Sequence, residues 1–266
     1  QMKVVIFEVA RNSLCATVFD TLRAGKPIKV EQHIATKLPD PSGDEPFSRI
    51  IADGVKSILS RAKIPKGRAH VILDSSESII RTLTLPYTNK EQIDRTFAFQ
   101  LESVVPGMDV SDYIFDYFIN SRNEKSTDVI ACAVKKSVLK DVIDGITKGG
   151  FQVQSVNVDM FCLFSTIKKT MPSQPEDNKK EESFLAIFYR GQTFRTILIE
   201  GRTARSLRSC SLPVPQISAT QIIERDKSRE WKTEDIRGPV PVLIVDSAVQ
   251  KEVQSLDDQI YSIQLA

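Results

Sequence analysis

The stretch LTLPYTNKEQIDRTFAFQLESVVPG, residues 83–107, places a strand end, a helix and a helix stop in direct succession. Pro86 ends the β-rich run Ile79 to Leu85, and Thr88 with Glu91 three residues on matches a capping box. Apolar side chains then recur at helical spacing until Pro106-Gly107. The predicted inner face of this helix consists of Ile93, Phe97, Leu101, Val104 and Val105.

The segments after this helix extend it into a larger unit. Tyr113 to Asn120 and Asp128 to Val134 predict a β-hairpin, because two β-rich runs flank a short polar turn. A helix is expected from Ser137 to the turn Gly149-Gly150, and a strand over Phe151 to Val158. Residues 78–158 therefore predict the order β-α-β-β-α-β, compact enough for an inserted α/β subdomain.

Two β-meanders surround this unit in the sequence. The first begins with a hairpin, and a third strand, a helix and a fourth strand follow: Lys3 to Val9, Ser13 to Thr21, Pro27 to Thr36, the helix from Phe47, and Ala69 to Leu73. The second repeats this pattern with strands at Phe184 to Phe188, Thr193 to Ile199 and Thr203 to Cys210, then a helix from Gln216 and a strand over Pro241 to Val245. The second half of the chain thus echoes the first.

The expected fold class is α/β with two lobes. Residues 172–182 are proline-punctuated and charged, which is typical of a linker. We expect a first lobe over 1–171, including an inserted subdomain at 78–158, and a second lobe over 183–266. Whether a membrane-spanning segment follows Ala266 stays open.

The composition favours an ordinary globular protein. The 266 residues carry a formal net charge of +2, which gives no broad cationic field for nucleic acid. Cys15, Cys132, Cys162 and Cys210 are far apart and form no metal-binding pattern, so we expect reduced thiols. No run approaches the about 18 apolar residues of a membrane helix, and we expect a cytoplasmic location.

Five sequence motifs carry a resemblance to a known family: Leu83-Thr-Leu-Pro86, Phe99 to Pro106, Tyr113 to Tyr117, Val129 to Val134 and Gly149 to Val153. With the two-meander layout, they resemble the actin-like PilM family and the cytoplasmic domain of GspL, which belong to type IV pilus and type II secretion assembly platforms. The resemblance covers nearly the whole chain. It implies an actin-like (RNase H-like) two-lobed fold with an inserted subdomain in the first lobe.

Nucleotide binding in this superfamily implies two hairpin turns of the form Asp-x-Gly, where glycine lets the backbone approach phosphate. The first turn here has Glu8 for the acid, Ala10 for the glycine, and Ser13 beyond it. The second keeps Gly191 and Thr193 but has no acid. We expect degenerate loops, no cofactor, no metal and no catalytic residue.

Two alternatives follow from the same resemblance. Glu8 and Thr193 would still support ATP in an actin-like switch protein of the same machinery. A carbohydrate or acyl kinase relative would instead need a substrate-binding acid between the lobes, and the sequence alone identifies none.

The resemblance also implies protein partners: PilN-like or GspM-like inner-membrane proteins and the assembly ATPase, with a homodimer left open and the protein held at the inner membrane. On the predicted helix, Phe99 lies about 200° from Phe97, beside Arg95 on the polar face. It is either a partner anchor or a contact with the other lobe. Trp231 lies in a charged run, where we expect it first to cap the core at a solvated helix end or loop; an interaction site is the second choice.

Overall fold

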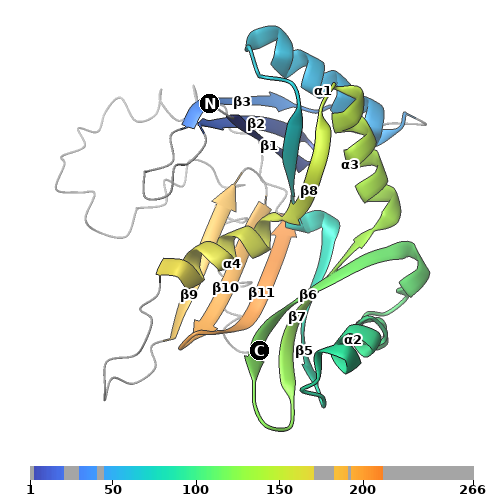
Figure 1. Cartoon of the computed structure of the whole chain (residues 1–266), viewed down its shortest axis with the longest axis vertical. Coiled ribbons are helices and arrows are strands. Elements are labelled where there is room, and N and C mark those ends of the chain that lie inside the picture. Colours follow the sequence, from blue (N-terminus) through green and yellow to red (C-terminus); the bar gives the residue numbers. More distant parts are fainter. Residues whose placement is uncertain (1–2, 21–29, 41–44, 171–182, 191–192, 212–266) are drawn as a thin grey trace, which may run out of the picture. The chain divides into compact units, whose positions relative to one another are not determined.

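The computed structural model describes residues 3–20, 30–40, 45–170, 183–190 and 193–211, which form three β-sheets and four α-helices (Figure 1). The first sheet has the order β3-β2-β1-β4-β8. Its strands are β1 (Lys3–Ala10), β2 (Ser13–Asp20), β3 (Val30–Lys37), β4 (Arg68–Leu73) and β8 (Gln152–Val158). The opening meander pairs antiparallel, whereas β4 and β8 run parallel to β1. The predicted opening strands are therefore confirmed over the described residues, and the predicted start of the third strand at Pro27 lies outside them.

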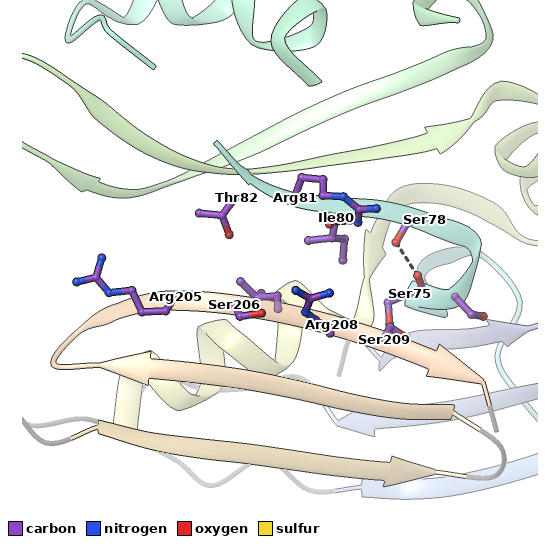
Figure 2. Close-up of a pocket in the computed structure, with 11 residues that line it drawn as sticks. Ser75, Ser78, Ile80, Arg81, Thr82, Arg205, Ser206, Arg208 and Ser209 are labelled. Carbon is purple, nitrogen blue, oxygen red and sulfur yellow. Dashed lines mark hydrogen bonds between the residues drawn. The ribbon is translucent and has the colours of Figure 1, made fainter. Parts of the chain in front are cut away.

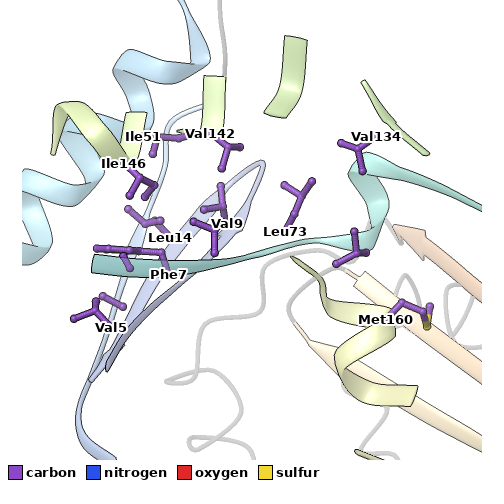
Figure 3. Packing of buried hydrophobic residues seen from close by; sticks show 14 of the residues in the cluster. Val5, Phe7, Val9, Leu14, Ile51, Leu73, Val134, Val142, Ile146 and Met160 are labelled. Carbon is purple, nitrogen blue, oxygen red and sulfur yellow. The ribbon is translucent and has the colours of Figure 1, made fainter. Parts of the chain in front are cut away.

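Two helices, α1 (Phe47–Arg61) and α3 (Lys136–Lys148), pack on this sheet and on each other. Figure 3 shows their side chains Ile51, Val142 and Ile146 with Phe7 and Leu14 of the strands. The helices approach so closely that a Cβ at Gly145 would lie 2.6 Å from the Cβ of Ile51. Only glycine fits at position 145 without a shift of its neighbours. The glycine at this position therefore allows the close contact between the two helices.

The second sheet has the order β5-β7-β6, and α2 (Lys90–Val104) covers one face of it. Its strands are β5 (Ser78–Leu85), β6 (Tyr113–Arg122) and β7 (Thr127–Lys135). The short 3-10 turns η1 (Ser75–Glu77) and η2 (Val110–Asp112) precede β5 and β6. Of the predicted inner face of α2, Ile93, Phe97 and Leu101 are buried, but Val104 is 50% exposed.

The cap of α2 differs from the sequence prediction. Asn89, not Thr88, is the N-cap, and its side chain accepts a hydrogen bond from the backbone N–H of Glu91 at 2.8 Å. Both residue types can serve as N-caps, so spacing to Glu91 alone did not distinguish them. The helix begins one residue later than a Thr88 cap would set it.

The predicted order β-α-β-β-α-β over 78–158 is confirmed element by element. Its members nevertheless belong to two sheets. The strands β5, β6 and β7 form a sheet of their own, whereas β8 pairs with β4 and α3 packs on α1. The parallel partner of β8 is β4, whose paired residues lie 84 to 85 positions earlier in the sequence, and no local pattern reveals that pairing.

The third sheet, of order β11-β10-β9, consists of β9 (Ser183–Arg190), β10 (Thr193–Glu200) and β11 (Thr203–Ser211), as predicted. Helix α4 (Asp159–Thr170) lies along this sheet and buries Met160 and Phe164 (Figure 1). These side chains share one core with Ile197 and Leu207. The third sheet is thus joined to the first by apolar packing through α4.

Several sequence predictions lie outside the described residues: the linker 172–182, the helix from Gln216, the strand Pro241 to Val245, Gly191 and Trp231. Cys15 is buried, Cys132 and Cys162 are free thiols, and burial raises the pKa of Cys132 to about 12. None of the helices in the described ranges is long and apolar enough to cross a bilayer.

Candidate functional site

Two carboxylates meet where parallel strands of the first sheet end. Asp74 directly follows β4, and Asp159 directly follows β8 and opens α4. Because β4 and β8 are parallel neighbours, their carboxyl ends lie at the same edge of the sheet. The side chains are only 10% and 19% exposed. Carboxylates at such an edge, in a protein interior, require a partner of opposite charge.

Arg195 of β10 supplies that charge. Its Nη2 lies 2.6 Å from Oδ2 of Asp74 and 2.5 Å from Oδ2 of Asp159, and its side chain is 5% exposed. One guanidinium group therefore bridges both acids and links the third sheet to the first. A buried arginine can do this because its planar fork donates several hydrogen bonds in fixed directions.

Hydroxyl groups complete the cluster. Nε of Arg195 donates to Oγ of Ser75 at 3.2 Å, and that hydroxyl donates to Oγ of Ser209 on β11 at 3.0 Å. Thr193 donates to Oδ2 of Asp74 at 3.4 Å. Figure 2 shows Ser75 and Ser209 at one end of a pocket that continues between β5 and β11.

The backbone also contributes donors to both acids. Oδ1 of Asp74 accepts from the N–H of Ser76 at 2.8 Å, and Oδ1 of Asp159 accepts from the N–H of Ser75 at 3.1 Å. The donors and the single arginine do not fully compensate two charges. Desolvation raises the pKa of Asp159 above its usual value, although Arg195 opposes that shift. The cluster therefore holds a negative charge at an energetic cost.

The residues of the two predicted phosphate loops have different positions. In the first, Ala10 ends β1 and Ser13 begins β2, on either side of the tight turn, and Glu8 lies within β1. The backbone N–H of Asp74 donates to the carbonyl of Val9 at 2.9 Å, so the end of β1 reaches the cluster. Thr193 reaches the same carboxylate from the second loop. One described residue from each predicted loop segment, Val9 and Thr193, thus bonds to Asp74.

Sequence analysis missed Asp74, Asp159 and Arg195, the three charged residues at the centre of this site. A signal was available for the acids, because each directly follows a buried strand, Ala69 to Leu73 and Phe151 to Val158. Reading those strands as parallel neighbours would have placed the acids together. The sequence identified no acid for a kinase-like site between the lobes; the two acids that the structure brings together here are paired with Arg195. Arg195 carries no such signal, since it stands in the middle of a strand.

The chain was compared with known proteins at the levels of sequence and structure. No protein-family model matches the sequence, and no curated protein matches it either. Among solved structures, the PilM–PilN type IV pilus biogenesis complex matches 99% of this chain and 78% of the other, with a TM-score of 0.67 and 14% identity. The fold is actin-like.

A second solved structure gives a weaker match to the same fold. The cytoplasmic domain of EpsL, an inner membrane component of the type II secretion system of Vibrio cholerae, matches 79% of this chain and 72% of its own, at a TM-score of 0.50 and 16% identity. The structural resemblance predicted from the sequence, to PilM and to the cytoplasmic domain of GspL, is confirmed at the level of the fold.

An actin-like fold implies a magnesium nucleotide, but the residues at this site do not fit one. A divalent cation between Asp74 and Asp159 would need the position that the guanidinium of Arg195 fills. The hydroxyl of Thr193 is committed to the same carboxylate, and Ala10 adds a Cβ at the first turn. Within the described ranges, no group of three or more potential ligand side chains could hold a metal ion.

Replacement of Arg195 by methionine tests how far this cluster supports the fold. Arg195→Met leaves two buried carboxylates uncompensated, and we expect the free energy of unfolding in urea to fall by about 3–5 kcal/mol. The matched control is Arg205→Met, which breaks an exposed pair with Glu200 and should cost less than about 1 kcal/mol. Adding Asp159→Asn to Arg195→Met should restore part of the loss. Equal losses for Arg195→Met and Arg205→Met would contradict this assignment.

The raised pKa of Asp159 predicts a pH dependence of stability. Above about pH 4 the unfolded chain releases this proton first, which favours the unfolded state. The unfolding free energy of the wild type should therefore fall relative to that of Asp159→Asn as the pH rises from about 4, and level off once the folded pKa is passed. Denaturant titrations between about pH 3.5 and 8 measure this difference. A difference that rises with pH would show that Arg195 outweighs desolvation.

Proposed function

We propose that this protein is a non-catalytic cytoplasmic scaffold of a type IV pilus or type II secretion assembly platform at the inner membrane. The observation that carries the proposal is the bridge from Arg195 to Asp74 and Asp159, which closes the edge where an actin-like enzyme would need free carboxylates. The match to PilM over nearly the whole chain supports the same class of machinery. Function does not follow from fold alone, so the buried cluster is the stronger support.

The scaffold would act by recruitment. The PilM structure contains PilN, and by analogy we infer a PilN-like or GspM-like membrane protein as one partner and the assembly ATPase as another. No turnover is required for this role. A rigid core held by a buried ion pair would instead fix the spacing of surfaces that meet different partners.

The second candidate function is an ATP-binding switch of the same machinery. Thr193 is the residue that favours it, because its hydroxyl lies at the cluster, and Glu8 stands where the first loop needs an acid. Against it, Arg195 occupies the space between the buried acids. Cation binding would require that arginine to leave both carboxylates at once.

Titration calorimetry with magnesium ATP and ADP separates the two functions. For a scaffold whose cation position is filled by Arg195, we expect no saturable heat and no rise in melting temperature with ligand. Glu8→Ala is the control: it should change nothing in a scaffold and abolish binding in a switch. Saturable binding at micromolar concentration, lost in Glu8→Ala, would move the assignment to the switch.

Helix α2 offers the surface that we propose for recruitment. Phe99 is 62% exposed, and Arg95 lies one turn before it, paired with Glu91 at 2.6 Å in an exposed ion pair. A large aromatic side chain left in water on a charged helix is typical of an interface anchor. Trp231, the other candidate anchor, lies outside the described residues.

Binding to the cytoplasmic segment of a PilN-like protein tests this surface. Phe99→Ser should weaken the affinity by about 30-fold, the size expected for loss of an aromatic anchor. Val104→Ser is the matched control, because Val104 is a 50% exposed apolar residue of the same helix. Surface plasmon resonance on the full chain measures both. Equal affinity of Phe99→Ser and wild type would remove Phe99 from the interface, and absence of binding by the wild type would count against recruitment of this partner.

A further inference from the structure

A polar pocket of about 540 Å³ lies between β5 and β11 (Figure 2). Its walls come from η1 and β5 on one side and from β11 on the other. The lining is dominated by arginines and hydroxyls, among them Arg81, Thr82, Ser206 and Arg208. It begins beside the buried cluster, at Ser75 and Ser209, and is a feature separate from the α2 surface.

Both walls are sheet edges. In the described part of the chain, β5 is the outer strand of the order β5-β7-β6, and β11 is the outer strand of β11-β10-β9. An edge strand directs every second pair of backbone N–H and C=O groups away from its sheet. Two such rows border the same pocket here.

The contacts of Ala204 show which groups of β11 point outward. Its N–H donates to Oδ1 of Asn120, and its carbonyl accepts from Nδ2 of the same side chain, at 2.9 and 2.7 Å. Both backbone groups of Ala204 therefore point away from β10. By the alternation of an antiparallel pair, Ser206 and Arg208 point the same way, and both line the pocket.

Two contacts fix the orientation of β5 in the same manner. The N–H of Ser78 donates to the carbonyl of Ser75, and the carbonyl of Ile80 accepts from Nη1 of Arg81. Neither group is used to pair with β7. The alternation then places the backbone groups of Thr82 outward, toward the pocket that this residue lines.

Positive charge dominates the pocket. Arg81, Arg205 and Arg208 are exposed side chains, and the pocket contains no aspartate or glutamate. Arg205 pairs with Glu200 at 2.6 Å outside the pocket. Within the described ranges no carboxylate forms an ion pair with Arg81 or Arg208, so two guanidinium groups are available to a ligand. Five serines and Thr82 add donors that suit carboxylate oxygens.

We propose that this groove binds an extended acidic segment of a partner protein, which pairs with the free edge of β11. Backbone groups of the segment bond to Ser206 and Arg208, and its carboxylates meet Arg208 and Arg81. The amide of Asn120 already bonds to this edge at Ala204 as a peptide group would, and so marks the end of the added strand. Strand addition of this kind combines backbone affinity with side-chain specificity.

The probe is a capped synthetic peptide of alternating glutamate and valine, labelled with a fluorophore and titrated with the full chain in anisotropy measurements. We expect saturable binding that weakens with salt, as charge pairing requires. The same peptide with lysine in place of glutamate should not bind. A version N-methylated at alternate residues on the pairing edge keeps every charge but loses backbone donors, and should bind at least about tenfold more weakly.

Variants of the chain locate the site. Arg208→Gln and Arg81→Gln should each weaken binding about tenfold, whereas Arg49→Gln, an exposed arginine of α1, should not. Ser206→Pro removes an outward N–H that β10 does not use, and should abolish binding with little change in melting temperature. Equal binding of the N-methylated peptide, no effect of Arg208→Gln, or binding of inorganic polyphosphate in place of the peptide would overturn the proposal. These outcomes are independent of the Phe99 experiment.

Discussion

The bridge from Arg195 to Asp74 and Asp159 is the interaction on which the described fold depends. Burial of three charged groups is costly, and their mutual attraction repays that cost only if every polar atom has a partner. Ser75, Thr193 and backbone N–H groups supply those partners. The bridge also joins two sheets that share apolar packing with α4 and a hydrogen bond between Ser75 and Ser209. Apolar packing brings layers together, whereas the ion pair selects one alignment of them.

The same interaction fills the place between the two acids that a divalent cation would need. Two acids with one arginine leave a net negative charge, a composition that a divalent cation would neutralise better than a guanidinium does. The arginine, however, is covalently part of β10 and pays no binding entropy. The guanidinium of Arg195 therefore compensates the carboxylates whether or not metal ions are present in solution. Under the proposed function, a frame that closes around such a cation would hold partner surfaces at fixed positions and would not need to open and close with a ligand.

The elements of this fold could be predicted because their signals are local. The period of Ile93, Phe97 and Leu101 identified α2, and alternating β-rich runs identified the meanders. The site could not be predicted in the same way. Asp74 and Asp159 are 85 residues apart and meet only through the parallel pairing of β4 with β8. Arg195 lies between uncharged residues of β10. Which face of that strand is buried depends on the elements that pack on it, and the local sequence does not show this. The positions of these three residues relative to one another depend on long-range strand pairing and not on local composition.

An edge strand with free backbone groups can bind a partner segment, but it can also aggregate, since any extended chain can pair with it. In β11 the arginines at 205 and 208 oppose that pairing, because a neutral strand would bury their charge without a partner. Asn120 occupies the edge at Ala204 and limits its free length. Only a strand with carboxylates in register would satisfy both the backbone and the guanidinium groups. The charges that protect the edge from unspecific pairing are therefore the same charges that would select an acidic partner.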